Sequence, residues 1–177
     1  RGLGDVYKRQ TVEALVTGMG GIFCRKKVAG PLDSEVEARY GIVGDNTAVI
    51  EMAEAAGLPL LKEEERNPLN TTTYGVGELI KDGIEKGCRR FFIGIGGSAT
   101  NDGGVGMLQA LGFDFLDEKG QQIPFGARGL EMLSKIATEH VIPELKACEF
   151  HIACDVTNPL CGENGCSVIY GPQKGAD

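Results

Sequence analysis

The first third of the chain carries the apolar–polar alternation of strands with one buried face. Within residues 35–40, charged residues alternate with apolar ones at every second position. This period of two is typical of a half-buried antiparallel strand. Turn signals at Gly30-Pro31 and at Gly44-Asp45-Asn46 divide residues 21–53 into three segments. The pattern therefore predicts three short strands joined by tight turns.

After Asn70 the period changes from that of a strand to that of a helix. Residues 70–87 place their apolar side chains on one helical face, a threonine of the Thr71–Thr73 run can cap the start, and Gly87 can end the helix. The apolar residues on that face are Val76, Leu79, Ile80 and Ile84. A continuous apolar run at 88–96 then predicts a buried strand.

The second half of the chain predicts three further elements. Residues 112–123 read as a hairpin that turns at Lys119-Gly120, and residues 127–137 as an amphipathic helix with Leu130, Leu133 and Ile136 in a row. Residues 148–160 read as a strand that runs into a polar loop. Because the start is antiparallel while helices and strands alternate in the middle, we expect an α/β fold with a mixed sheet.

A glycine-rich loop follows the strand predicted at 88–96, and a short apolar helix pattern follows the loop. Between Gly94 and Gly104 the chain holds five glycines among small polar side chains. Glycine leaves backbone N–H groups uncovered, and the start of the following helix favours anions. A tight turn without a function remains the alternative. The residues predicted to contact phosphate or substrate are Gly96, Gly97, Ser98, Thr100, Asn101 and Gly103, while Asp102 could help to hold a cation.

A second polar loop follows the strand predicted at 148–160. Asp155, Thr157 and Asn158 offer a base, a hydroxyl donor and an amide donor within four positions. Ligands of open α/β sheets tend to bind outside the carboxyl ends of the strands, which is where both loops begin. For Asp155, a carboxylate that only caps a turn is an equally good interpretation.

One alternative for the glycine-rich loop is a dinucleotide site. Gly94–Ala99 fits the G-x-G-x-x-A pattern, and Asp117 lies at a suitable distance to meet a ribose. That would make the protein a nicotinamide-dependent oxidoreductase. Against it, Asn101–Gly104 is a poor helical opening, and the helix pattern at 105–111 is only about two turns long. The Walker A pattern is absent, since no Gly-Lys-Ser/Thr follows the glycines.

Composition narrows the function classes further. The net charge of −7 argues against a nucleic-acid surface, and the short basic run at Cys24–Lys27 reads as a solvated strand edge. The six cysteines form no C-x-x-C pair and are not spaced with the two histidines as zinc ligands are. Neither a signal peptide nor an apolar run of membrane length is present. We therefore expect a reduced, cytoplasmic protein without nucleic-acid or membrane partners.

Three ordered motifs resemble the bacterial glycerate kinase family that acts on D-glycerate. They are "IGIGGSATNDGGVGMLQALG", "ACDVTNPLCGENG" and "YGPQKGAD", and the resemblance runs from Thr11 to Asp177. It implies a fold of two α/β domains with the active site between them, of which this chain covers mainly the central inserted domain. It also implies ATP-dependent, Mg²⁺-assisted phosphorylation of D-glycerate to a phosphoglycerate, with 2-phosphoglycerate favoured, in glyoxylate and sugar-acid catabolism.

The resemblance fixes the positions of the candidate residues, and their roles are inferred from phosphoryl transfer, which needs positioning and charge neutralisation. Asp155 would orient or deprotonate the attacking hydroxyl, or bind Mg²⁺ through its carboxylate. Asn158 would hydrogen-bond the substrate, and Lys174 would neutralise developing charge, although a plain surface lysine is an equally good interpretation of Lys174.

Departures from the family pattern limit these expectations. Residues 1–10 do not match the family and are expected to be foreign to the natural protein, whereas residues 11–177 form a partial glycerate kinase domain. Because further family motifs are missing, we expect the fragment alone to be inactive. A module that kept the fold for binding but lost catalysis is the third alternative.

Overall fold

The computed structural model describes residues 10–176, so the segment expected to be foreign lies outside the described residues except for Gln10. The main sheet is mixed and has five strands in the order β1-β2-β3-β4-β7. Its first three strands are antiparallel, whereas β3, β4 and β7 run parallel to one another. The strands are β1 (Ile22–Ala29), β2 (Glu35–Val43), β3 (Thr47–Glu51), β4 (Arg90–Gly94) and β7 (Glu149–Ala153). This arrangement confirms the predicted mixed-sheet α/β fold and the three strands at its start.

The two predicted turns form where the backbone needs left-handed geometry. In the turn between β1 and β2, Asp33 has φ 60°, and between β2 and β3 both Gly44 and Asn46 have positive φ. Asp and Asn tolerate this region better than other residues with a side chain, which explains their place at these corners. The basic run at Cys24–Lys27 lies on the edge strand β1 and is largely exposed, as expected.

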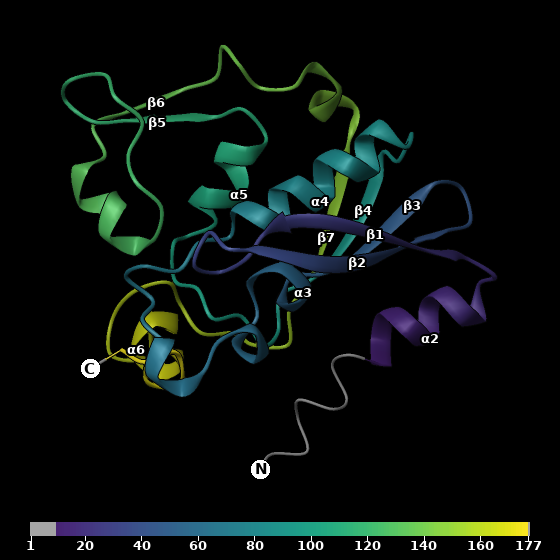
Figure 1. Ribbon diagram of the computed structural model, residues 1–177, viewed down its shortest axis with the longest axis horizontal. Helices are drawn as coiled ribbons and strands as arrows, with labels where there is room; N and C mark the ends of the chain where they lie inside the picture. Colours follow the sequence, from purple (N-terminus) through teal and green to yellow (C-terminus); the bar gives the residue numbers. More distant parts are fainter. Residues whose placement is uncertain (1–9, 177) are drawn as a thin grey trace.

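Helices cover both faces of the sheet (Figure 1). The principal core lies between one face and α4 (Tyr74–Glu85), where Tyr40, Ile50 and Phe91 are fully buried. A smaller core lies under α2 (Gln10–Gly18), where Val16 packs with valines of β2 and β3. The predicted face of α4 is confirmed, since Val76, Leu79, Ile80 and Ile84 are all buried. A threonine of the predicted run does bind the helix start: Thr73, at the N-cap, makes no cap hydrogen bond, but Thr72 Oγ1 accepts from the Tyr74 N–H.

A buried polar cluster fixes α4 to the sheet. The Tyr40 hydroxyl donates to Asp82 Oδ2 over 2.7 Å, and the ammonium groups of Lys26 and Lys86 contact the same carboxylate. Burial opposes charge on Asp82, but hydrogen bonds from Lys86, Tyr40 and Lys26 outweigh it and lower the pKa of the carboxyl. The cluster thus keeps a charged pair at the edge of the main core.

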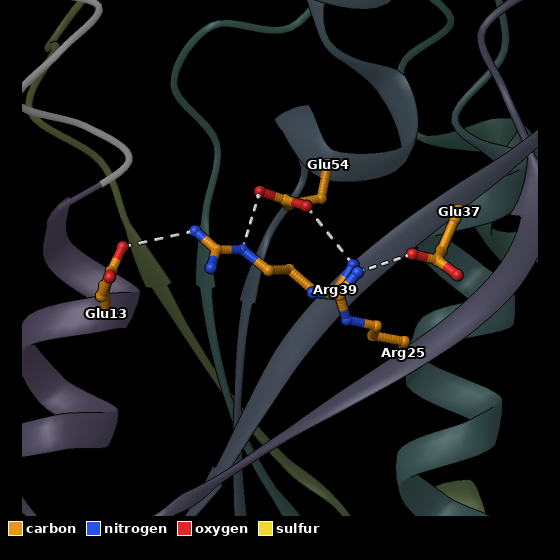
Figure 2. A network of polar contacts seen from close by, with 5 residues as sticks. All are labelled: Glu13, Arg25, Glu37, Arg39 and Glu54. Atoms are coloured by element: carbon orange, nitrogen blue, oxygen red, sulfur yellow. Dashed lines mark hydrogen bonds and ion pairs between the residues drawn. The ribbon is translucent and has the colours of Figure 1, made fainter.

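An arginine network ties α2 and α3 (Ala53–Ala56) to β2 (Figure 2). Arg39 lies 3.6 Å from Glu54 of α3 and 3.5 Å from Glu13 of α2, and its own backbone N–H donates to Glu54. Nearby, Arg25 pairs with Glu37 across the first two strands at 2.7 Å. Pairs this exposed each contribute little free energy, so their effect is mainly to orient the two helices.

The segment between β4 and β7 departs from the sequence prediction at two places. The predicted helix at 127–137 is wrong: the chain forms the 3₁₀ helix η3 (Ala127–Met132) and then the strand β6 (Lys135–Ala137), which pairs with β5 (Asp114–Leu116). Gly126, with φ 84°, precedes η3, and the open edge of β5 supplies backbone partners that a helix would lose. Ile136 is accordingly 54% exposed rather than buried.

The predicted hairpin is confirmed only in its turn. Gly120 has positive φ, the Asp117 N–H donates to the Gln121 carbonyl, and a single bridge joins Leu116 to Gln122. The return segment pairs with β5 only through this bridge, because β6 occupies the position beside β5.

The remaining short elements lie near the carboxyl edge of the sheet or follow β6. They are η1 (Leu58–Leu60), η2 (Glu63–Glu65), α5 (Val105–Ala110), η4 (Pro143–Ala147), α6 (Cys166–Tyr170) and η5 (Pro172–Lys174). All six cysteines are free thiols. Within residues 10–176, no helix has the length and apolar character needed to cross a membrane.

Candidate functional site

Both predicted loops leave the same edge of the sheet. In the parallel ladders Gly94 pairs with Ala153, and Glu51 pairs with Gly94. The glycine-rich loop after β4 and the Asp155 loop after β7 therefore start side by side at the carboxyl ends of neighbouring strands. This is the position at which open α/β sheets bind ligands.

Asp102 organises the glycine-rich loop from inside. Its side chain is buried, and its two oxygens accept four hydrogen bonds: from the N–H and hydroxyl of Thr73, and from the N–H groups of Gly104 and Gly106. The carboxylate thereby joins the start of α4 to the start of α5. Since these donors already engage both oxygens, the geometry does not suit the metal-ligand role predicted for Asp102.

The loop is also supported from behind by backbone contacts. The Ala99 N–H donates to the Ala56 carbonyl over 2.8 Å, and the Leu58 N–H donates to the Gly97 carbonyl over 2.9 Å. From the threonine run, the buried Thr71 hydroxyl donates to the Ala99 carbonyl. The loop is thus a fixed part of the fold. Three of its glycines meet a backbone requirement, because Gly97, Gly103 and Gly104 have φ 73°, 63° and 78°.

Lys174 is brought directly onto this loop. Its ammonium donates to Ser98 Oγ over 3.0 Å and to the Thr100 carbonyl over 2.6 Å. Burial lowers the pKa of Lys174, although the nearby Asp102 carboxylate counteracts part of that shift. The Lys174 ammonium is thus held against the glycine-rich loop by two hydrogen bonds.

The short helix α6 connects the two predicted loops. Ser167 bonds to the Asn101 side-chain amide over 3.0 Å. One turn later, the Tyr170 hydroxyl donates to Asn158 Oδ1 over 2.8 Å. The Asn158 amide also donates to the Asn164 carbonyl, so this side chain shapes its own loop. Sequence reasoning missed Ser167 and Tyr170, although both lie in or just before the quoted motif "YGPQKGAD".

The other predicted residues lie on the two loops at the carboxyl edge of the sheet. Asp155 and Thr157 are exposed on the loop after β7. Gly96 follows β4 directly and is half-buried. Ser98, Thr100 and Lys174 are therefore in contact, Asn101 and Asn158 are linked through α6, and Asp155 and Thr157 lie at the same edge of the sheet.

Glu51 is a further carboxylate at this edge that sequence reasoning did not find. It ends β3 in register with Gly94, and a Cβ built on Gly94 would lie 2.6 Å from Glu51 Oε2. The glycine therefore leaves the space that the carboxylate occupies. The sequence of β3 offers no alternation that would single out Glu51, and the pairing with Gly94 is visible only in the fold.

A groove of about 630 Å³ lies at the opposite end of the sheet and is not part of this site. It is lined by α2 residues, by the β2–β3 turn and by the amino ends of β4 and β7, where Phe92 stacks on His151. The loops that carry the candidate chemistry leave the carboxyl ends, so we place the site there.

Comparison with known proteins agrees with this geometry. Residues 10–177 match the model of the glycerate kinase family. The chain belongs to the glycerate kinase family.

Two relatives illustrate the similarity. The glycerate kinase of Haemophilus influenzae and the glycerate 2-kinase of Escherichia coli are each 52% identical over 167 residues, which is 94% of this chain and 44% of theirs. A crystal structure from Salmonella typhimurium LT2, assigned as glycerate kinase 2, superposes with a TM-score of 0.91 at 49% identity and covers 94% of this chain. The chain thus spans less than half the length of these glycerate kinases.

The glycerate kinase fold does not support the dinucleotide alternative. In a Rossmann fingerprint the helix opens within the glycine motif, whereas here α5 starts only at Val105, after Gly104 in the left-handed region. Asp117 lies on the small β5–β6 unit rather than at the end of a strand in the main sheet.

The described residues also bear on Mg²⁺ binding. Within residues 10–176, no group of three or more His, Cys, Asp or Glu side chains is placed to hold a metal ion. Of the two predicted ligands, Asp102 is buried among its donors and Asp155 lies on an exposed loop.

Proposed function

We propose that this chain forms one wall of the active site of an ATP-dependent kinase that phosphorylates D-glycerate. The observation that carries the proposal is the contact of Lys174 with Ser98 and Thr100 at the carboxyl edge of the sheet. It gathers a cation, a hydroxyl and a glycine-rich backbone where two parallel strands end. Phosphoryl transfer depends mainly on this kind of positioning and charge stabilisation.

The glycine-rich loop and Lys174 act on the phosphate oxygens. An ammonium group has three hydrogens, and two of those on Lys174 are used in the contacts with Ser98 and Thr100. The third can donate to an oxygen of the transferring phosphoryl group. Backbone N–H groups around Gly96 and Gly97 and the side chains of the loop supply neutral donors beside it.

The reaction moves one phosphoryl group and one proton. A hydroxyl oxygen of glycerate forms a bond to the γ-phosphorus of ATP, the bond from that phosphorus to the β,γ-bridging oxygen breaks, and ADP leaves. Asp155, on the loop after β7, accepts the hydroxyl proton. Thr157 and Asn158 belong to the same loop and position the acceptor, with Asn158 held by Tyr170. A bound Mg²⁺ would neutralise charge on the phosphates of ATP, and Asp155 is the exposed carboxylate of this edge that could contribute to holding it.

The finer assignment rests on the family. The E. coli relative is named glycerate 2-kinase, which favours 2-phosphoglycerate as the product. Glyoxylate and sugar-acid catabolism in the cytoplasm is the setting that fits such an enzyme. Because the chain spans 44% of the length of its relatives, we propose that the activity belongs to a full-length enzyme and that residues 1–177 alone are inactive.

A coupled ADP-release assay on a full-length enzyme that carries this sequence tests the proposal. D-glycerate should support turnover, whereas L-glycerate and lactate should support much less, and ³¹P NMR of the product should show phosphate on the 2-hydroxyl. Titration with NADH should show no binding. ADP release that does not depend on D-glycerate would refute the proposed function.

A further inference from the structure

Arg66 lies against the segment that carries Lys174. It follows η2, and its backbone carbonyl is so close to Gly175 that a Cβ on that glycine would lie 2.0 Å from it. Arg66 Cβ would be only 3.1 Å away from the same point. Gly175 has φ 88°, which also favours glycine. In Figure 1 the segment after α3 and the C-terminal α6 accordingly lie side by side.

The guanidinium of Arg66 lacks the partners that other half-buried arginines have. Arg39 pairs with Glu13 and Glu54, and Arg89 donates to two backbone carbonyls. Within residues 10–176, Arg66 has no ion pair, and its buried Nε has no hydrogen-bond acceptor. Three glutamates immediately precede it, yet the nearest in sequence, Glu65, instead accepts from the Lys62 N–H.

A buried donor without an acceptor is expensive. Leaving such a group unpaired costs its desolvation free energy, and more when it is charged, so a native structure rarely keeps one without a reason. The position next to Lys174 and Gly175 supplies the reason, because an anion bound at the loop would be the missing acceptor. A guanidinium recognises a carboxylate or a phosphate through two parallel hydrogen bonds.

We infer that Arg66 is a substrate-binding residue whose guanidinium holds an oxyanion of the bound substrates. The inference rests on the proposed function, since that function brings two kinds of oxyanion to this edge: the carboxylate of a hydroxy acid and the phosphates of a nucleotide. Arg66 and Lys174 then have different roles in binding the substrates. Lys174 acts as a point cation tied to the glycine-rich loop, and Arg66 fixes the orientation of a planar or tetrahedral anion.

Steady-state kinetics of Arg66→Gln and Arg66→Lys in the full-length enzyme test this role. Arg25→Gln is the matched control, because Arg25 is exposed on the edge strand β1 and paired with Glu37. We expect Arg66→Gln to raise one substrate's KM at least tenfold, with the thermal midpoint of unfolding close to that of the control. Arg66→Lys should recover only part of the loss, since an ammonium cannot make the paired contact. Added guanidinium ion at millimolar concentration should partly restore Arg66→Gln.

The choice of substrate whose KM rises distinguishes the two anions. A rise for D-glycerate alone, with no change for the uncharged analogue glycerol, identifies the carboxylate. A rise for ATP alone identifies a phosphate, and either result supports the inference. Unchanged KM values for both substrates would overturn the inference. So would a loss of activity that is accompanied by a lowered unfolding midpoint and is not restored by guanidinium ion. If the unmodified enzyme does not phosphorylate D-glycerate, the proposed function fails. The role of Arg66 is then tested by calorimetric titration of ATP: weaker ATP binding by Arg66→Gln than by Arg25→Gln supports it, and equal binding overturns it.

Discussion

Replacing Asp102 with asparagine should loosen the glycine-rich loop without emptying the core. Oδ2 of Asp102 accepts from the Thr73 N–H, the Thr73 hydroxyl and the Gly106 N–H, while Oδ1 accepts from the Gly104 N–H. An asparagine has one oxygen and one NH₂ group of nearly the same size. The NH₂ group must therefore face at least one N–H donor.

The magnitude follows from those contacts. The best placement keeps the three donors of Oδ2 on the amide oxygen and sets the NH₂ group against the Gly104 N–H. The loop then loses one acceptor outright, at about 1–3 kcal/mol, and the other contacts lose the extra strength of bonds to a charged group. We expect a total of about 2–4 kcal/mol, concentrated in the loop and the first turns of α4 and α5.

Hydrogen exchange measured by mass spectrometry on the full-length enzyme can locate this change. Peptides that cover residues 96–107 should exchange faster by about 30-fold or more in Asp102→Asn, which corresponds to at least 2 kcal/mol. Peptides from β1 and β2 should not change. Asp45→Asn, at an exposed turn, is the control. Equal protection of residues 96–107 in Asp102→Asn and the unmodified enzyme would refute the reasoning that Asp102 holds the loop.

Three other predictions concern the same edge and a remote pair. Gly94→Ala places a Cβ 2.6 Å from the end of the flexible Glu51 side chain, so the fold should persist while kcat/KM falls by about tenfold to a hundredfold; an unchanged value would place Glu51 outside the site. Because burial lowers the pKa of Lys174 below its ordinary 10.5, kcat/KM should decline at alkaline pH with a midpoint below 10.5, and Lys174→Arg should move that decline upward. The hydrogen bond to Asp114 raises the pKa of His140 above 6.5, so its stabilising contribution is complete below pH 6.5 and lost as pH rises through the raised pKa. In Asp114→Asn, the pKa of His140 measured by NMR should fall toward its ordinary 6.5, and a pKa equal to that in the unmodified protein would contradict the pairing.

The elements that the sequence predicted well are those whose pattern is local. The alternation along β2 and the helical face of α4 are set by burial against one neighbouring layer, so their periods remain visible in the chain. The segment at 127–137 was predicted wrongly for the opposite reason. Its leucine spacing fits a helix, but the deciding factor was the open edge of β5 some twenty residues earlier, which pairs with Lys135–Ala137.

The candidate site divides in the same way. Glycines and small polar residues at a strand end mark the loop in the sequence, and the motif "YGPQKGAD" marked Lys174 through family resemblance. Local sequence cannot show that Asp102 turns inward to bond Thr73, which lies 29 positions away, or that Gly94 makes room for Glu51. No role was predicted for Arg66 from the sequence. Its significance arises from the contact with Gly175 and from an Nε that has no hydrogen-bond acceptor within residues 10–176.

The most direct test of the central claim is the turnover of Asp155→Asn in the full-length enzyme with saturating ATP and D-glycerate. The claim is that the loops after β4 and β7 form one phosphoryl-transfer site, with Asp155 taking the hydroxyl proton. It predicts a fall in kcat of about 10²- to 10⁴-fold, with the unfolding midpoint and ATP binding unchanged. A kcat close to that of the unmodified enzyme would contradict the claim.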